Sequence, residues 1–235
     1  MSSSKLRTSG YLELCEKAQA EYPKIDRFRL AAEAERLKFV FPKAAQLVRK
    51  QILDIGSGAI ESPDAPLGLG KLIFGKIWPR NTVFDPWYCR IAHLGGAQVY
   101  GIDIGASPGE NYSHIQADLL EEGSLLDTMK LSGVSNLDHI NNYKFTTEPD
   151  SRHAVGGTSP HIAIKQLGMS PDGSKDNNGF LRGIDYESLF NLNEKIRQQV
   201  LQLLKEGGTY LHGEFLYRKK GGSLSRVKTM QGFGS

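Results

Sequence analysis

The chain of 235 residues has few cysteines, little net charge and no long apolar run. Cys15 and Cys89 are far apart, so they lack the spacing of a zinc or redox motif, and two lone cysteines are typical of a reducing compartment. No segment approaches the roughly 20 apolar residues that span a bilayer, and the first residues lack the apolar core of a signal peptide. We therefore expect a cytoplasmic protein without a membrane segment.

The net charge of +3 permits an anionic partner but does not require one, because most basic residues are interspersed with acidic ones. Apolar residues at 39% and charged residues at 23% are ordinary values for a globular domain. The sequence contains no internal repeat and no low-complexity tract. The length is enough for one well-packed domain, or for a domain with an appended subdomain.

Residues 10–50 have the apolar spacing of helices, with breaks near Pro23 and Pro42, and we interpret residues 1–50 as an N-terminal helical cap on a main domain of residues 51–235. "QILDIG" and "AQVYGIDIG" are predicted to form the first two strands of that domain. "DPWYCRIAHLGG" is predicted to form the helix between them, capped by Asp85 and ended by the glycine pair 95–96.

"YSHIQADLLEEG" predicts a third strand, and residues 124–131 a short helix. Residues 185–208 predict a long amphipathic helix ended by Gly207 and Gly208, followed by one strand over "TYLHGEFLYRKK". Residues 132–183 are polar and irregular, with modest strand candidates in "LDHINNYKF" and "PHIAIKQL". The alternation predicts an α/β fold: a doubly wound, mostly parallel sheet with helices on both faces.

Three acidic residues stand at or just beyond the ends of the first three predicted strands, where an open parallel sheet binds its ligand. Asp54 lies on the first strand just before Gly56 and Gly58, which let the backbone turn sharply and approach a ligand closely. Asp103 ends the second strand, where a carboxylate can accept both hydrogen bonds of a ribose diol. Asp118 follows the third strand and can accept a bond from the exocyclic amine of adenine.

In this order, "LDIGSG", "GAQVYGIDIG", "HIQADLLE" and "LLKEGGTYLHGEFL" resemble the motif set of class I S-adenosylmethionine (SAM)-dependent methyltransferases. The resemblance implies that the glycine turn meets the methionine part of the cofactor, that Asp103 holds the ribose and that Asp118 holds the adenine amine. It implies that Asp54 orients the turn or reaches the cofactor amine through water. The cofactor-binding residues expected on this basis are Asp54, Ile55, Gly56, Ser57, Gly58, Asp103, Ile104, Asp118 and Leu119. Loop capping and turn chemistry are the alternative explanation of the three aspartates.

A dinucleotide is disfavoured because its pyrophosphate needs a third glycine and a helix directly after the turn. Ile60 or Glu61 stands where that glycine belongs, and residues 59–85 form an insertion that displaces the helix. Rooted beside the turn, the insertion is either a lid or acceptor-pocket wall, or a surface elaboration. The segment "GKLIFGKI" lacks both the hydroxyl residue and the preceding strand of a P-loop.

Two further departures from the family concern its acceptor side. No segment between 132 and 183 matches the family's fourth strand, and the short C-terminus supplies at most one short strand where a β-hairpin is usual. Candidate general bases are His153, the most site-like, His161 and His212, for which a structural hydrogen bond is the alternative. We expect no metal ion.

The resulting function hypothesis is methyl transfer from SAM to an oxygen or nitrogen of a small-molecule acceptor, with no membrane partner. Two alternatives stay open. One is a non-catalytic or degenerate SAM-fold protein; the other is a methyltransferase acting on nucleic acid, indicated by the basic segment "YRKKGGSLSRVK" and disfavoured by the lack of interleaved aromatic residues.

Overall fold

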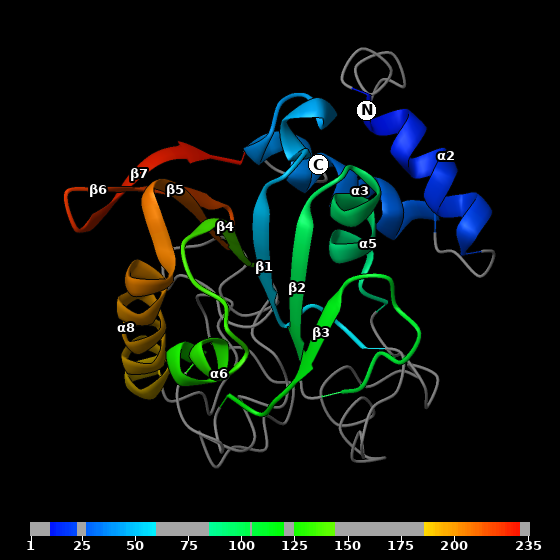
Figure 1. The fold of residues 1–235 in the computed structure, drawn as a ribbon. Coiled ribbons are helices and arrows are strands. Elements are labelled where there is room, and N and C mark those ends of the chain that lie inside the picture. The colour runs from blue at the N-terminus through cyan, green and yellow to red at the C-terminus, as the bar shows by residue number, and fades with distance from the viewer. Residues whose placement is uncertain are drawn as a thin grey trace, which may run out of the picture.

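A seven-stranded sheet in the order β3-β2-β1-β4-β5-β6-β7 forms the centre of the protein (Figure 1). The computed structural model describes residues 10–22, 27–59, 85–103, 105–119, 125–143 and 186–230, and the side chains within them except those at 27–29 and 186–190. The strands are β1 Gln51–Ile55, β2 Gln98–Asp103, β3 Ser113–Gln116, β4 Leu137–Asn142, β5 Leu204–His212, β6 Phe215–Lys220 and β7 Ser223–Thr229. The first five are mutually parallel, whereas β6 and β7 follow as antiparallel hairpins.

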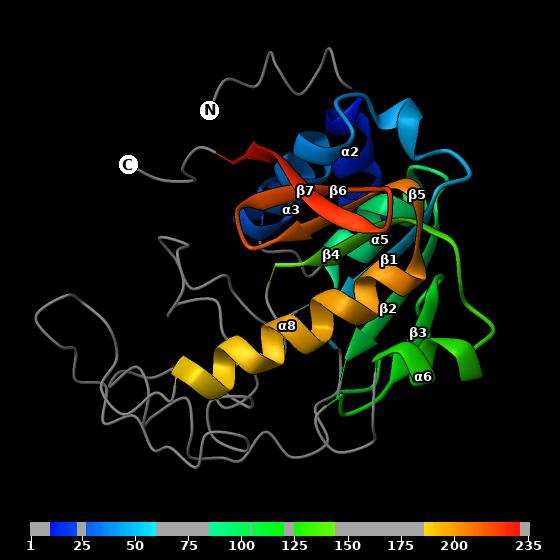
Figure 2. The same ribbon diagram turned by 90° about the vertical axis from the view of Figure 1, so that its left-hand side faces the viewer.

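Helices cover both faces of this sheet (Figures 1 and 2). Their bounds are α2 Tyr11–Glu21, α3 Arg27–Val40, the 3-10 helix η1 Ala44–Leu47, α5 Trp87–Leu94, α6 Leu125–Leu131 and α8 Tyr186–Leu203. Helices α2, α3 and α5 share one apolar core with Ile52 and Val99, and α6 and α8 share the other with Leu53 and Ile55. The fold is therefore a doubly wound, Rossmann-like α/β fold, as the sequence predicts.

Alternation along β1 explains how one short strand serves both cores. Ile52 lies in the core under α5, while Leu53 and Ile55 lie in the core under α6 and α8, and all three side chains are fully buried. A central parallel strand that is apolar on both faces is expected where helices pack on both sides. The same alternation leaves Asp54 on the α5 face of the sheet, next to the end of the strand.

The modest strand candidate "LDHINNYKF" does contain a strand, and it supplies the fourth strand for which the sequence offers no clean match to the family pattern. Within the interval 132–183, residues Leu137–Asn142 form β4, which pairs with β1 on one side and β5 on the other. Four of the six residues are polar, yet five of the six side chains are buried. The remainder of that interval from residue 144 onward, with "PHIAIKQL" and His153 and His161, lies outside the described residues, as do residues 60–84 of the insertion and Ile104.

The C-terminal half of the sheet also differs from the prediction. Residues 209–220 form two strands joined by a turn at Gly213, not one strand. Helix α8 ends at Leu203, and β5 begins at once, so the glycine pair 207–208 does not end the helix. The register between β4 and β5 shifts between Leu137 and His139. On the β5 side, residues 205–208 are the extra residues at this shift. Gly207 has φ 77°, which glycine adopts readily in such a bulge.

An ion cluster fixes the amino ends of the central strands. Asp138 accepts the backbone N–H of Gln51 at 3.0 Å and a hydrogen bond from the Lys50 ammonium at 3.0 Å, and it pairs with Lys205. Partial burial raises the pKa of Asp138, but the Gln51 N–H and the two lysines outweigh it, so the pKa lies below its ordinary value. The cluster thus joins β1, β4 and β5 at the edge opposite the strand ends that carry the glycine turn.

The helix after the insertion begins one residue later than its sequence signals indicate. Pro86 stands at the N-cap position of α5, and no side chain caps the helix there. The Asp85 carboxylate instead pairs with Arg90 at 3.2 Å, while its backbone carbonyl accepts the N–H of Trp87. Gly95 ends the helix as expected.

Candidate functional site

The strand order reverses between β1 and β4, because the chain passes from β1 to β2 and β3 on one side and to β4 and β5 on the other. In open α/β sheets the ligand crevice lies outside the carboxyl ends of the strands at this point. The register pairs Asp54 of β1 directly with Asn141 of β4. The candidate site is therefore this edge of the sheet, formed by the ends of β1, β2, β3 and β4.

The glycine turn at the end of β1 is closed by hydrogen bonds to β2. Gly56 and Gly58 have φ of 68° and 91°, which a side chain would disfavour. The N–H groups of Gly56 and Ser57 both donate to the carbonyl of Ile102, at 2.9 and 3.2 Å. The N–H of Gly58 donates to Oδ2 of Asp103 at 3.0 Å. Three consecutive backbone donors are thus used within the protein.

Asp103 joins two turns at the end of β2. Its Oδ1 accepts the N–H of Gly105 at 3.1 Å while Oδ2 holds Gly58, and the side chain remains partly exposed. An ionised carboxylate offers about four lone-pair directions, so two of them remain for a ligand. The sequence placed a ligand-binding acid at this residue, and the structure places it in direct contact with the glycine turn.

Asp54 lies behind the turn with 3% of its surface exposed. Its Oδ1 accepts a hydrogen bond from Nδ2 of Asn141 at 2.6 Å, and the Cys89 thiol of α5 donates to Oδ2 at 3.6 Å. The neighbouring Tyr88 is fully buried, and burial together with Asp54 raises its pKa well above the ordinary value, so its phenol is neutral. Asn141 was not among the predicted site residues, because its strand was only a modest candidate and no motif marked the residue.

The remaining predicted cofactor residues divide into edge and core positions. Asp118 lies two residues beyond the end of β3 with 8% of its surface exposed, at the same edge as Asp103. Leu119 packs partly buried against the core under α6. The side chain of Ile55 lies in that core and that of Ser57 is fully enclosed, so only their backbone groups can face a ligand.

Of the histidines that the structure describes, His114 of β3 lies beside the turn after β2, with its Nε2 2.7 Å from the Gly105 carbonyl oxygen. His212 ends β5, buried and stacked on Tyr210 with 5.4 Å between ring centroids. His139 of β4 was not predicted; its Nδ1 lies 2.9 Å from the Thr209 hydroxyl, and burial lowers its pKa to about 3. Because the His139 imidazole is neutral and enclosed, we assign it a structural role in the packing between the sheet and α5.

The N-terminal helices reach the same edge of the sheet. Glu33 and Arg36 of α3 form an ion pair with 2.5 Å between Oε1 and Nη1, and both side chains are largely buried. The Arg36 guanidinium stacks on the ring of Tyr143, directly after β4, at 3.4 Å from the ring centroid. Helix α3 therefore forms one wall beside the end of β4.

A second buried arginine fixes the loop that follows β2. Arg90 of α5 is 5% exposed and makes a two-nitrogen contact with Glu110, with Nε at 2.9 Å and Nη2 at 2.5 Å from Oε1. Its guanidinium also lies against the rings of Tyr22 and Trp87. The contact ties α2 and α5 to residues 105–112, which begin at the Gly105 N–H bound by Asp103.

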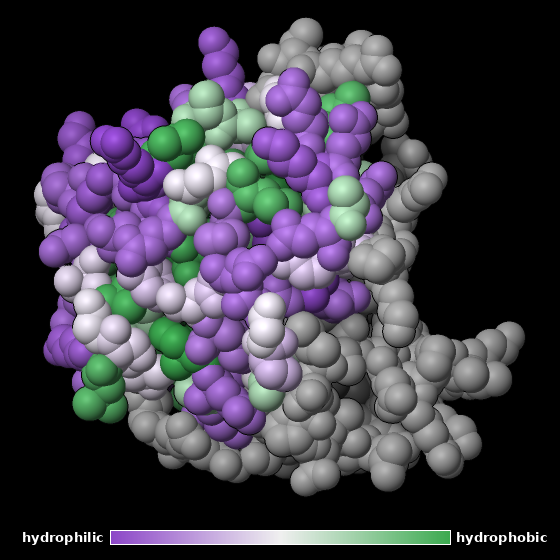
Figure 3. Space-filling model, turned by 45° about the vertical axis from the view of Figure 1, so that its right-hand side comes forward, coloured by the Kyte–Doolittle hydropathy of each residue, from purple (hydrophilic) through white to green (hydrophobic). Residues whose placement is uncertain are grey.

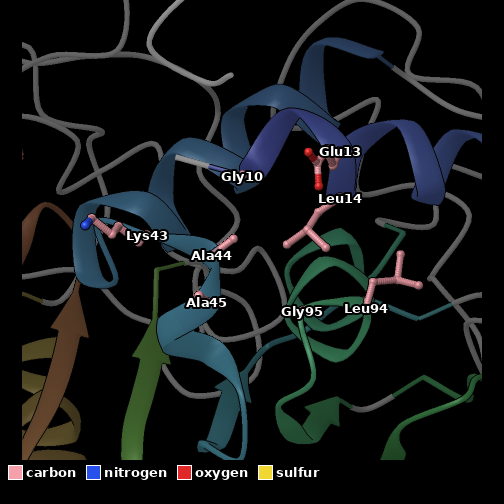
Figure 4. A pocket seen from close by; sticks show the side chains of 8 residues that line it. All are labelled: Gly10, Glu13, Leu14, Lys43, Ala44, Ala45, Leu94 and Gly95. Carbon is pink, nitrogen blue, oxygen red and sulfur yellow. The ribbon is translucent and has the colours of Figure 1, made fainter. Parts of the chain in front are cut away.

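A shallow hollow of about 400 Å³ lies elsewhere, between α2, η1 and the end of α5 (Figure 4). It is lined by Gly10, Glu13, Leu14, Lys43, Ala44, Ala45, Leu94 and Gly95. Figure 4 shows the Lys43 and Glu13 side chains well apart, with small and apolar side chains between them. Gly95 and Leu94 lead into the amino end of β2, so the hollow lies far along the sheet from the glycine turn.

The face in Figure 3 is mostly hydrophilic over the described residues, with apolar side chains in small separate groups. Among the described residues, the large apolar side chains that stand exposed are Val48, Leu131 and Val227, on three different segments. Among the residues the structure describes, no cluster of His, Cys, Asp and Glu could hold a metal ion. Over the same residues, no helix has the length and apolar character needed to cross a bilayer.

No protein-family model matches the chain, and no curated protein matches it either. Among solved structures, it is similar to the ligand-free aldohexose dehydrogenase of Thermoplasma acidophilum, at 17% sequence identity and a TM-score of 0.25. The match covers 46% of this chain and 35% of the dehydrogenase chain. A likeness this slight carries no argument about cofactor or reaction.

Proposed function

We propose that the protein binds SAM at the carboxyl edge of β1, β2 and β3 and transfers its methyl group to an oxygen or nitrogen of a small-molecule acceptor. One observation carries this proposal: the N–H groups of Gly56, Ser57 and Gly58 are all bonded within the protein. A diphosphate is held by free backbone N–H groups at such a turn. A turn without them suits a ligand that brings no phosphate.

The charges at this edge support the same conclusion. Asp54, Asp103 and Asp118 follow or end three neighbouring strands, so the edge favours a cation and disfavours an anion. The sulfonium cofactor is cationic at its reactive end and carries no phosphate. The residues present therefore fit SAM better than a dinucleotide.

Each residue has a role that its environment allows. Asp103 keeps two lone-pair directions for a ribose diol, Asp118 can accept the adenine amine, and Gly56 and Gly58 allow close backbone approach. When bound, the cofactor supplies an electrophilic methyl group. The protein contributes by holding the acceptor in line with it, a task that proximity and orientation can accomplish without a general base.

Contacts of the β6–β7 hairpin favour a small acceptor over nucleic acid. The cations of this hairpin are Arg218, Lys219, Lys220, Arg226 and Lys228. Lys219 donates to the carbonyls of Leu201 and Leu204, and Lys228 donates to that of Phe39. These internal bonds remove part of the basic surface that would otherwise face a phosphate backbone.

The first test is thermal unfolding of the purified, ligand-stripped protein with SAM, S-adenosylhomocysteine (SAH) or NAD. A ligand at 100 times its dissociation constant stabilises a protein by about 2.7 kcal/mol, which for a chain of this size corresponds to about 5–10 °C. We expect that shift with SAM and SAH, and its loss in Asp103→Ala. A shift with NAD alone would overturn the proposal, and SAH release on incubation of SAM with candidate acceptors then tests catalysis and separates the enzyme from a non-catalytic SAM binder.

A further inference from the structure

A largely buried arginine stands at the end of β4. The guanidinium of Arg36 in α3 lies 3.4 Å from the ring centroid of Tyr143, the first residue after β4, and its Nη1 pairs with Oε1 of Glu33 at 2.5 Å. Only 12% of the Arg36 side chain is exposed. Its Nε is enclosed as well, and no acceptor for that N–H exists among the residues that the structure describes. Because native proteins hydrogen-bond nearly all buried polar groups, this donor needs a further partner.

The guanidinium of Arg36 is held in place from several directions. Leu30 and Leu37 of the same helix are buried in the core under α5, so they fix α3 against the sheet. The ring of Tyr143 and the carboxylate of Glu33 then fix the plane and one edge of the guanidinium. Burial lowers the pKa of Arg36, but Glu33 and Tyr143 raise it by more, so the group stays charged. A charged and immobile donor of this kind is suited to binding an oxygen ligand.

The shape of the guanidinium decides which ligand group fits best. Its Nε and the adjacent amino nitrogen point two N–H bonds in parallel, and this pair matches the two oxygens of a carboxylate. Glu33 contacts Nη1, so the Nε side of Arg36 is left for a second oxygen ligand. A neutral carbonyl would satisfy Nε alone, whereas a carboxylate satisfies both donors and adds the attraction of opposite charges.

We infer that Arg36 binds a carboxylate group of the methyl acceptor. The inference rests on the proposed function, which places the cofactor at the ends of β1, β2 and β3, so that the end of β4 is the adjoining part of the same crevice. The three aspartates of the crevice belong to the cofactor side, and Arg36 stands on the other side, against the residue that follows β4. A cationic methyl donor and an anionic acceptor then attract each other. The acceptor is therefore a small carboxylic acid, held by its carboxylate, with another oxygen or nitrogen facing the cofactor.

Pairs of probes that differ in charge and hardly in shape test this site. They are acetate with acetamide and benzoate with benzamide. Each probe is titrated calorimetrically into the full chain, with and without saturating SAH, for wild type, Arg36→Met and Arg36→Lys. The matched control is Lys38→Met, because Lys38 forms a second ion pair of the same spacing on α3, with Glu35 at 3.5 Å.

We expect at least one of the two acids to bind wild type about 10- to 100-fold more tightly than its amide, the value of a hydrogen bond to a charged group. Arg36→Met should abolish this preference. Arg36→Lys keeps a charge for Glu33 but lacks the parallel donors, so it should reduce the preference at least about threefold. Lys38→Met should leave the preference unchanged, and SAH affinity should stay within about threefold in every variant.

The opposite results separate this inference from the proposed function. If wild type binds neither acid, or binds each acid no better than its amide, the inference is overturned. An unchanged preference in Arg36→Met overturns it too, and Arg36→Lys decides in the same way if the methionine variant does not fold. Each of these results leaves the proposed function intact as long as SAH binds. Failure of wild type to bind SAH would instead overturn the proposed function, whatever the acids do.

Discussion

Replacing Asp103 by asparagine tests whether its carboxylate holds the glycine turn in the absence of ligand. The two carboxylate oxygens accept the N–H groups of Gly58 and Gly105 at 3.0 and 3.1 Å. Asparagine keeps one oxygen and places an amide nitrogen at the other position, so one backbone donor faces another donor. The protein then loses one charge-assisted hydrogen bond, and the other becomes an ordinary one.

The size of the effect follows from these contacts. A hydrogen bond to a charged group contributes about 1.5–3 kcal/mol, and the partial exposure of Asp103 places it near the lower end, at about 2 kcal/mol. For a chain of this size each kcal/mol shifts the melting temperature by about 2–4 °C, so Asp103→Asn should melt about 4–8 °C below wild type.

The assay is thermal unfolding followed by circular dichroism, without ligand and near neutral pH. The control is Glu16→Gln, which removes a carboxylate from the exposed surface of α2 and should shift the free energy of unfolding by no more than about 0.5 kcal/mol. Equal melting temperatures for Asp103→Asn and the control would refute the argument, because the carboxylate would then contribute nothing to closing the turn.

Three further substitutions test the packing behind the site. His139 stays neutral in the folded protein down to about pH 3 but takes up a proton near pH 6.5 when unfolded, so wild-type stability should fall as the pH drops below about 6.5. His139→Leu should flatten that loss in urea unfolding between pH 7 and about 4. Asp138→Asn should lower the free energy of unfolding by about 1 kcal/mol at pH 7, a value discounted for the half-exposed lysine partners. The difference from wild type should shrink as the pH falls below about 4, because the unfolded wild-type chain then takes up a proton that the folded carboxylate resists. Gly101→Ala places a Cβ 2.9 Å from both Ser57 Oγ and Tyr112 Cε2, and should lower the free energy of unfolding in urea by about 1–3 kcal/mol.

Each of these expectations has a clear opposite result. An unchanged pH slope in His139→Leu would mean that another group causes the acid loss. A stability difference for Asp138→Asn that persists undiminished at pH 3 would show that the carboxylate charge is not its source. Wild-type stability in Gly101→Ala would contradict the close contact between β2 and the glycine turn.

Much of the fold follows from local sequence patterns, because the elements concerned bury one regular apolar face. The periodicity of residues 185–203 predicts the buried face of α8, and the structure confirms Leu192, Ile196, Val200 and Leu203 on it. Apolar, glycine-terminated segments likewise predict β1 and β2. Here local propensity and tertiary packing agree.

For the fourth strand the sequence contains only a modest candidate, "LDHINNYKF", because the segment has no regular apolar face. Strand β4 has the sequence "LDHINN", in which His139 and Asn141 point to the α5 face and bond Thr209 and Asp54. Its buried polar residues bond to specific partners on other strands, and a single sequence does not indicate those partners. The glycine pair 207–208 led to a wrong prediction of the helix end for a related reason. These glycines lie in an irregularity of β5 that its pairing with β4 determines.

The candidate site was predictable to the extent that strand ends determine it. Asp54, Asp103 and Asp118 lie at one edge, as expected, because parallel strands bring their carboxyl ends together. The bonds among Asp103, Gly58 and Gly105, and the contact of Asn141 with Asp54, depend on three-dimensional register and could not be predicted.

The most direct test of the central claim is calorimetric titration of ligand-stripped wild-type protein with SAH and, separately, with NAD. We predict saturable binding of SAH at one site per chain and no measurable heat with NAD, because the N–H groups of Gly56, Ser57 and Gly58 are all bonded within the protein and the edge carries three carboxylates. Saturable binding of NAD, or the absence of binding by SAH, would contradict it.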